Sequence, residues 1–249
     1  MMLKTYLLYA IFGVLSLQVF SQEDKKYQFK RDVKFEFVYK FKLKEGYIDR
    51  MRLVLLIPND VKDRQTIKSI QFSINPDSLL SDMGNAYAVF HLKNIERDFD
   101  IKMVTDLTIY KFIASANTDT AIDFQPYLKE ERFIETSSQE IIQTAATLKA
   151  ATDIETVINT YTYVNEHITY KKKAEIGAEA VLESGVGKCT DFSDLFIALL
   201  RVNKIPAKVV RGFVVNPDSE NPFHQWAEAY LKHQGWVLFD PTTKTYFYC

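Results

Sequence analysis

The sequence has 249 residues, of which 47% are hydrophobic, 14% aromatic and 25% charged, and this composition indicates a folded chain of one or two domains rather than a disordered one. Its 31 basic and 32 acidic side chains leave a net charge of −1, so no field of the whole chain favours nucleic acid or an anionic membrane surface. We expect no nucleic-acid partner, and a core that does not depend on a scaffold of disulfides.

One long apolar stretch, residues 6–20, follows Lys4 and ends at the small residue Ser21. This order of basic, apolar and small residues is typical of a secretory signal peptide, and the stretch is shorter than the ~20 residues that span a bilayer. We expect residues 1–21 to be removed before Gln22, which leaves a secreted or periplasmic protein without a membrane span. An uncleaved N-terminal anchor is the alternative.

The first half of the mature sequence has the period of β-strands. Apolar and polar residues alternate along residues 33–43, and further strand-like runs cover residues 51–57, 70–74, 87–92 and 101–112. No helical period interrupts them. We expect five or six strands in an antiparallel β-sandwich domain over residues 22–125.

After a polar stretch at residues 115–131 the pattern becomes helical. Ser137 with Glu140 and Thr152 with Glu155 each fit a capping box, in which a hydroxyl and a carboxylate satisfy the free amides at a helix start. A third, shorter helix is expected over residues 174–182. We place the second domain at residues 126–249.

A glycine-rich turn, residues 185–188, leads into Cys189 at the start of a further predicted helix. The free N–H groups and the dipole at a helix N-terminus favour a thiolate, which makes a nucleophile, and the same amides could stabilise an oxyanion. The alternative is that Cys189 is a small core residue, because free cysteine is among the most buried residue types.

His224 and Asp240 are predicted to lie at one rim of a hairpin. Residues 223–230 and 236–239 form two strand-like runs joined by a turn at residues 233–235. The start of the first strand therefore lies beside the end of the second, which brings a base next to a carboxylate that can orient it. Among the four histidines, we find such a partner in the sequence for His224.

The second half of the chain also carries a set of motifs in a fixed order. The residues are Gly187, Cys189, Asp191, Leu195, Ala198, Leu199, Leu200, Arg201, Ile205, Pro206, Ala207, Gly212, His224, Gln225, Trp226, Ala227, Glu228, Gly235, Trp236, Asp240, Pro241 and Thr242. Over residues 137–243 this set resembles the transglutaminase-like core of the papain-like cysteine enzymes. The resemblance implies an α+β fold with helices packed on an antiparallel sheet, and a triad of Cys189, His224 and Asp240. The preceding sandwich resembles bacterial relatives with an N-terminal β domain.

The resemblance implies thiol-dependent acyl transfer on peptide or isopeptide amides, with a protein or peptide as substrate. Both hydrolysis and transfer to a lysine amine stay open, and for an exported chain we expect hydrolysis by a cysteine peptidase or amidase. No cofactor or metal is implied, since one Cys and one His at this spacing form no zinc pattern. The rival interpretation is a catalytically silent module that binds peptide or glycan.

Four further residues have open roles. Asp191 could contact substrate, although a carboxylate in the first turn of a helix is commonly favoured by the dipole alone, and we prefer that role. Tyr170, upstream of the helix, is a candidate donor to an oxyanion hole. Trp226 is expected in the core. Cys249 is a free thiol, a disulfide partner of Cys189 or the mark of a truncated chain. The sequence does not indicate an oligomeric state.

Overall fold

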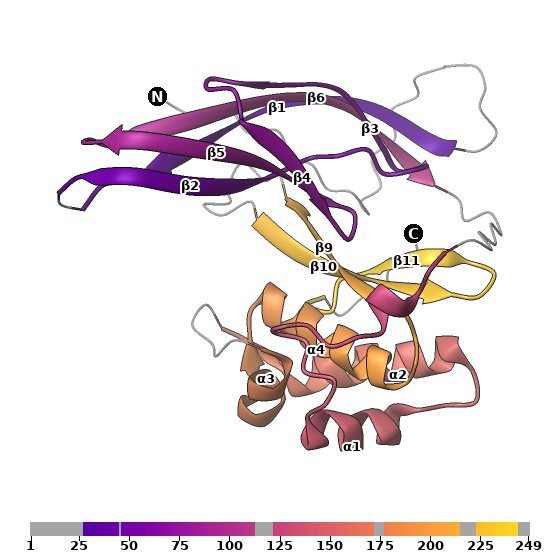
Figure 1. The fold of residues 1–249 in the computed structure, drawn as a ribbon. Helices are drawn as coiled ribbons and strands as arrows, with labels where there is room; N and C mark the ends of the chain where they lie inside the picture. The colour runs from indigo at the N-terminus through magenta and orange to yellow at the C-terminus, as the bar shows by residue number, and fades with distance from the viewer. Residues whose placement is uncertain (1–26, 45, 113–121, 172–176, 215–222, 244–249) are drawn as a thin grey trace. The chain divides into compact units, whose positions relative to one another are not determined.

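A computed structural model describes residues 27–44, 46–112, 122–171, 177–214 and 223–243 (Figure 1). The predicted signal peptide at residues 1–21 and Cys249 lie outside the described residues. No helix within the described ranges has both the length and the apolar character needed to cross a bilayer. By compactness the chain divides into Met1–Ile113 with Gly212–Phe223, and Ala114–Arg211 with His224–Cys249. Our division between residues 125 and 126 rests on sequence pattern and stays a prediction.

The described residues of the first unit form two three-stranded antiparallel sheets, where the sequence predicted five or six antiparallel strands. One has the order β1-β6-β3 and the other the order β2-β5-β4. The strands are β1 (Tyr27–Phe41), β2 (Ile48–Ile57), β3 (Gln65–Phe72), β4 (Ser78–Asp82), β5 (Asn85–Ile95) and β6 (Phe99–Phe112). The alternation predicted for the first strand is present in β1, where Val33, Phe35 and Tyr39 are buried. Period-two patterning thus placed one face of this strand in the core.

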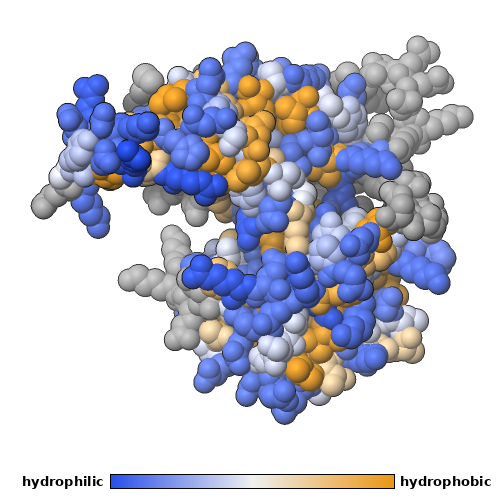
Figure 2. Space-filling view, viewed as in Figure 1, coloured by the Kyte–Doolittle hydropathy of each residue, from blue (hydrophilic) through white to orange (hydrophobic). Residues whose placement is uncertain are grey.

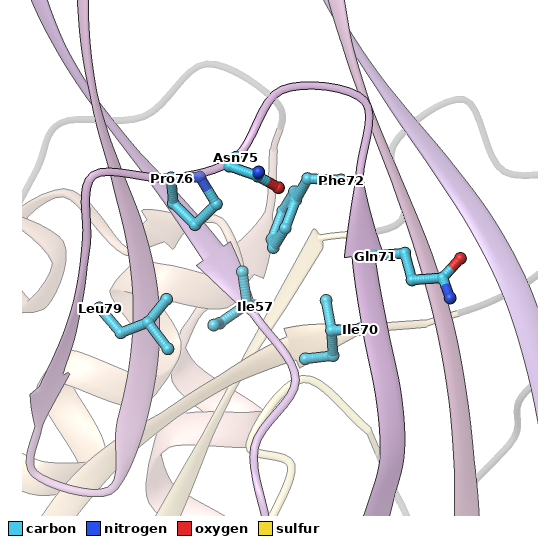
Figure 3. A pocket seen from close by; sticks show the side chains of 7 residues that line it. All are labelled: Ile57, Ile70, Gln71, Phe72, Asn75, Pro76 and Leu79. Carbon is cyan, nitrogen blue, oxygen red and sulfur yellow. The ribbon is translucent and has the colours of Figure 1, made fainter.

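The first unit also has apolar surface. Leu79 of β4 is 64% exposed, and Val54, Ile74 and Leu80 are exposed as well; Figure 2 shows hydrophobic surface on this unit. A cavity of about 550 Å³ lies beside β2, β3 and β4, as Figure 3 shows. Its lining residues are Ile57, Ile70, Gln71, Phe72, Asn75, Pro76 and Leu79. Since no titratable side chain lines it, this cavity does not carry acid–base chemistry.

The second unit packs helices on a small antiparallel sheet. The helices are α1 (Gln139–Leu148), α2 (Asp153–His167), α3 (Ala178–Ser184) and α4 (Cys189–Val202), with the 3-10 turn η1 (Gln125–Tyr127). The sheet has the order β11-β10-β9, formed by β9 (Ala207–Phe213), β10 (Phe223–Leu231) and β11 (Gly235–Phe239). α4 packs against each of the other helices, and Figure 1 shows the four gathered on one side of the sheet. The chain therefore has the predicted α+β fold.

Side-chain caps mark the starts of α1 and α2. The predicted capping box of α2 is present, because Thr152 N–H donates to Glu155 Oε2 at 3.1 Å and Glu155 N–H donates to Thr152 Oγ1 at 3.3 Å. The box predicted at Ser137 is wrong by one residue, since Ser138 is the N-cap of α1 and its hydroxyl accepts from Ile141 N–H. The N–H of Ser137 donates instead to Glu130 Oε2, at 2.8 Å.

Candidate active site

Cys189 is the first residue of α4, where the sequence placed it. The preceding Lys188 is extended, and its N–H donates to Asp191 Oδ2 at 2.7 Å. Asp191 is fully buried and also accepts a hydrogen bond from Thr190 Oγ1 at 3.2 Å. A Cβ on Gly187 would come within 3.0 Å of Asp191 Cβ, so the glycine leaves room for this cap. These contacts favour the helix-capping role of Asp191 over contact with substrate.

The hairpin brings His224 and Asp240 together. β10 and β11 pair antiparallel, with Ala227 opposite Phe239 and Leu231 opposite Gly235, so the turn lies at the end of the hairpin remote from His224. His224 Nε2 lies 2.9 Å from Asp240 Oδ2. The two side chains are 18% and 14% exposed, so water screens this pair only weakly.

Hydrogen bonds hold the Asp240 carboxylate in its charged form. Its second oxygen, Oδ1, accepts from Thr242 N–H at 3.1 Å and from Thr242 Oγ1 at 2.6 Å. Burial raises the pKa of Asp240, but the bonds from His224 and Thr242 outweigh burial and leave the pKa below its ordinary value. Asp240 is therefore an anion at neutral pH, with both oxygens in use.

His224 also lies beside Cys189. Because Nε2 of the ring is bonded to Asp240, Nδ1 is the nitrogen left for the thiol. Burial lowers the pKa of His224, but its hydrogen bonds to Asp240 and Cys189 and their charges raise it to about 9. Burial raises the pKa of Cys189, and the bonds from His224 and from the N–H groups of Gln225 and Thr190 bring it below its ordinary value. These directions favour a thiolate–imidazolium pair at neutral pH.

The other histidines lack this environment. His91 is exposed, 3.4 Å from the exposed Asp77. His167 stacks on Tyr163 with ring centroids 4.1 Å apart, and His233 occupies the hairpin turn with a φ of 73°. Within the described ranges, no group of three or more His, Cys, Asp or Glu side chains could hold a metal ion.

A second set of contacts anchors the turn that carries Asp240, and no motif in the sequence indicates these contacts. Tyr161 of α2 donates its hydroxyl hydrogen toward two carbonyls, 3.0 Å from Asp240 O and 2.7 Å from Thr243 O. Asn165, one turn later on α2, donates to Pro241 O at 3.1 Å and to Thr243 O at 2.5 Å. Two side chains of α2, which no sequence motif distinguishes, thus fix the backbone of the turn that carries the Asp240 carboxylate.

Trp226 is closer to the site than we expected. It is half-buried rather than in the core, and its ring meets that of His224 edge-on, with centroids 4.6 Å apart. An aromatic edge or face beside an imidazole limits how far the imidazole can rotate. The alternation along β10 could have predicted this contact, because residues two positions apart, such as His224 and Trp226, lie on the same side of a strand.

Tyr170 lies beside the turn that precedes Cys189. It pairs with Gly187 through the short parallel strands β7 (Thr169–Tyr170) and β8 (Val186–Gly187), and Lys171 N–H donates to Gly187 O at 2.9 Å. The residue is 55% exposed. Burial, followed by the negative charges of Cys189, Asp191 and Asp240, raises the pKa of its hydroxyl, so Tyr170 keeps its proton. Its role as an oxyanion donor stays a prediction.

Asp194, one turn after Cys189 on α4, is a buried acid that sequence analysis did not single out. Burial raises its pKa to about 7, against the opposing effects of the Gln225 hydrogen bond and the Arg211 charge, while the charges of Asp191 and Glu135 raise it further. Asp194 is 5% exposed, and its Oδ1 accepts from Gln225 Nε2 at 2.8 Å. An asparagine at this position keeps an oxygen that can accept the same bond.

We predict that Asp194→Asn stabilises the protein at pH 8 more than at pH 4. The pKa of Asp194 is higher in the folded protein than the ~3.9 of an unfolded chain. Between about pH 4 and 7 the folded protein therefore holds a proton that the unfolded chain has lost, and its free energy of unfolding falls as the pH rises. Asparagine cannot ionise, so Asp194→Asn should remove this fall in the free energy of unfolding, which amounts to at most about 4 kcal/mol. Urea titrations at both pH values measure it; an equal effect at both would contradict the prediction.

Comparison with known proteins finds a family model that matches the part of the chain that carries this site. Residues 141–241 match the family model described as transglutaminase-like superfamily. YebA of Bacillus subtilis, an uncharacterized protein, is 35% identical over 98 residues, which are 34% of this chain and 13% of YebA. The chain therefore aligns with only a small part of that relative's length.

A solved structure shows a similar fold. A protein described as a candidate cysteine protease from Cytophaga hutchinsonii superposes with a TM-score of 0.65 at 18% identity, over 86% of this chain and 79% of that one. The periplasmic domain of TgpA from Pseudomonas aeruginosa gives a TM-score of 0.46 at 17% identity, over 91% of this chain and 76% of its own. At this identity, the Cytophaga structure supports the fold alone.

Proposed function

Residues 141–241 form a transglutaminase-like core, and on that premise we propose that the protein is a thiol enzyme that transfers the acyl group of a peptide or isopeptide amide. One observation carries the proposal: a thiol at a helix N-terminus lies beside an imidazole whose other nitrogen is 2.9 Å from a half-buried carboxylate. This is the order of nucleophile, base and orienting group that covalent catalysis requires.

In the proposed reaction, His224 Nδ1 takes the proton of Cys189, and Asp240 fixes the ring by accepting from Nε2. The thiolate attacks the amide carbonyl, whose oxygen becomes negative. Backbone N–H groups at the N-terminus of α4 would stabilise this negative oxygen, because the first turn of a helix leaves N–H groups without intrahelical acceptors. His224 then protonates the leaving amine, and the acyl group stays on Cys189 as a thioester.

We propose that water resolves the thioester, which makes the protein a cysteine peptidase or amidase with a protein or peptide substrate. Transfer to a lysine amine is the other outcome of the same thioester. The apolar run at residues 6–20 supports a secreted or periplasmic location. Hydrolysis at such a location is feasible, because the proposed reaction consumes water and requires no cofactor supplied by the cytoplasm.

The test is the rate of alkylation of Cys189 by iodoacetamide as a function of pH, followed by peptide mass mapping. Mapping separates Cys189 from Cys249. The expected result is reaction well below the ~8.5 pKa of a free thiol, because His224 and two backbone N–H groups stabilise the thiolate. His224→Ala should remove this low-pH reactivity, while His233→Ala, a change at the exposed hairpin turn, should not.

Two results would overturn the proposal. One is a Cys189 that reacts only after denaturation, and the other is a Cys189 bridged to Cys249. Either result would favour the silent module that binds peptide or glycan.

A further inference from the structure

Gln225 is a buried polar residue between the two halves of the proposed site. It follows His224 on β10 and, because side chains alternate along a strand, faces the opposite way, where it is 3% exposed. Its Nε2 donates to Asp194 Oδ1 at 2.8 Å and to Thr190 O at 3.1 Å. Its Oε1 accepts from Arg211 Nε at 3.2 Å. Both ends of the amide are therefore bonded inside the protein.

The backbone of Gln225 is held on the same helix. Its carbonyl accepts from Ser193 Oγ at 3.1 Å, and Ser193 is fully buried. Its N–H hydrogen-bonds the sulfur of Cys189. Two side-chain bonds and two backbone bonds thus join Gln225 to residues 189–194, the first turn and a half of α4.

Packing alone does not require these bonds. An apolar side chain of similar volume fills a buried position without the cost of burying an amide, whereas a fully bonded polar network fixes one alignment of the elements that it joins. Here the joined elements are the helix that begins at Cys189 and the strand that carries His224. A slip between them changes the distance from thiol to imidazole.

We propose that Gln225 is a positioning residue that sets the alignment of Cys189 with His224 and holds its own N–H on the Cys189 sulfur. The inference rests on the proposed function, since it concerns how the thiolate is formed and kept.

The test compares Gln225→Met with the wild type in the alkylation experiment described above. Methionine has a similar length and no amide, so the side-chain bonds to Asp194, Thr190 and Arg211 are lost. We expect the half-point of the pH profile of Cys189 to rise by about one unit toward that of a free thiol, and the rate at pH 6 to fall about tenfold. Gln234→Met, the same exchange at an exposed position of the hairpin turn, should leave the profile unchanged.

Ser193→Ala gives a second, independent reading, because it removes the hydroxyl that holds the Gln225 carbonyl and leaves the amide side chain intact. It should shift the profile in the same direction, and it carries the test if Gln225→Met does not fold by circular dichroism. Wild-type profiles in both folded variants would overturn the inference and leave the proposed function standing. If wild-type Cys189 itself lacks low-pH reactivity, the proposed function has failed and the inference falls with it.

Discussion

Replacing Cys189 by alanine should lower the turnover of an amide substrate by at least about 10⁴-fold. The proposed thioester forms on the Cys189 sulfur, and alanine offers no atom that can replace it. Labelled casein serves as the substrate, with release of labelled peptides as the measure of hydrolysis and incorporation of a fluorescent primary amine as the measure of transfer. Whichever activity the wild type has should be lost.

The loss should occur without unfolding. Cys189 is half-buried at the first position of α4, and the bonds that cap this helix involve Lys188 and Asp191 rather than the thiol. We expect the midpoint of thermal unfolding to stay within a few degrees of the wild type. Cys249→Ala, which removes the other thiol, should retain turnover. Full turnover by a folded Cys189→Ala protein would exclude a mechanism through this sulfur.

Replacing Arg201 by methionine should lower the free energy of unfolding by about 3–5 kcal/mol. The Arg201 side chain is fully buried near the end of α4. Its Nε and Nη2 donate to Ala207 O at 2.9 and 2.8 Å, and Nη1 donates to Lys129 O at 2.6 Å and lies 2.7 Å from Glu131 Oε1. Methionine fills part of the volume but leaves these acceptors buried without their donor.

A matched exchange at an exposed arginine separates the effect of the buried bonds from that of losing the charge. Arg132 is exposed, with its guanidinium 5.0 Å from the ring of Phe133, so Arg132→Met should change the free energy of unfolding by less than about 0.5 kcal/mol. Urea unfolding of both variants, followed by circular dichroism, gives the comparison. Equal effects would mean that the guanidinium bonds of Arg201 add nothing to stability.

Where a signal is local, the sequence predicted the structure well. The alternation along β1, the capping box at Thr152 and Glu155, and the hairpin that joins His224 to Asp240 are all present. Where the local signal is absent, the prediction failed. Strand β4 (Ser78–Asp82) was missed because all five of its residues are exposed, so no alternation marks one face as buried. The N-cap of α1 was misplaced because Ser137 and Ser138 can both cap a helix. In the structure the N–H of Ser137 donates to the carboxylate of Glu130 instead.

Sequence alone thus determined the fold class, the helix start at Cys189 and the side of the hairpin on which His224 and Asp240 meet, because each depends on a period or turn within a short stretch of chain. Only the tertiary structure decided what surrounds these groups. Gln225 against Asp194, Tyr161 against the Asp240 turn and Trp226 against His224 arise when separate elements pack. The same packing buries both groups, and it also brings the hydrogen bonds and charges that, against the effect of burial, raise the pKa of His224 and lower that of Cys189.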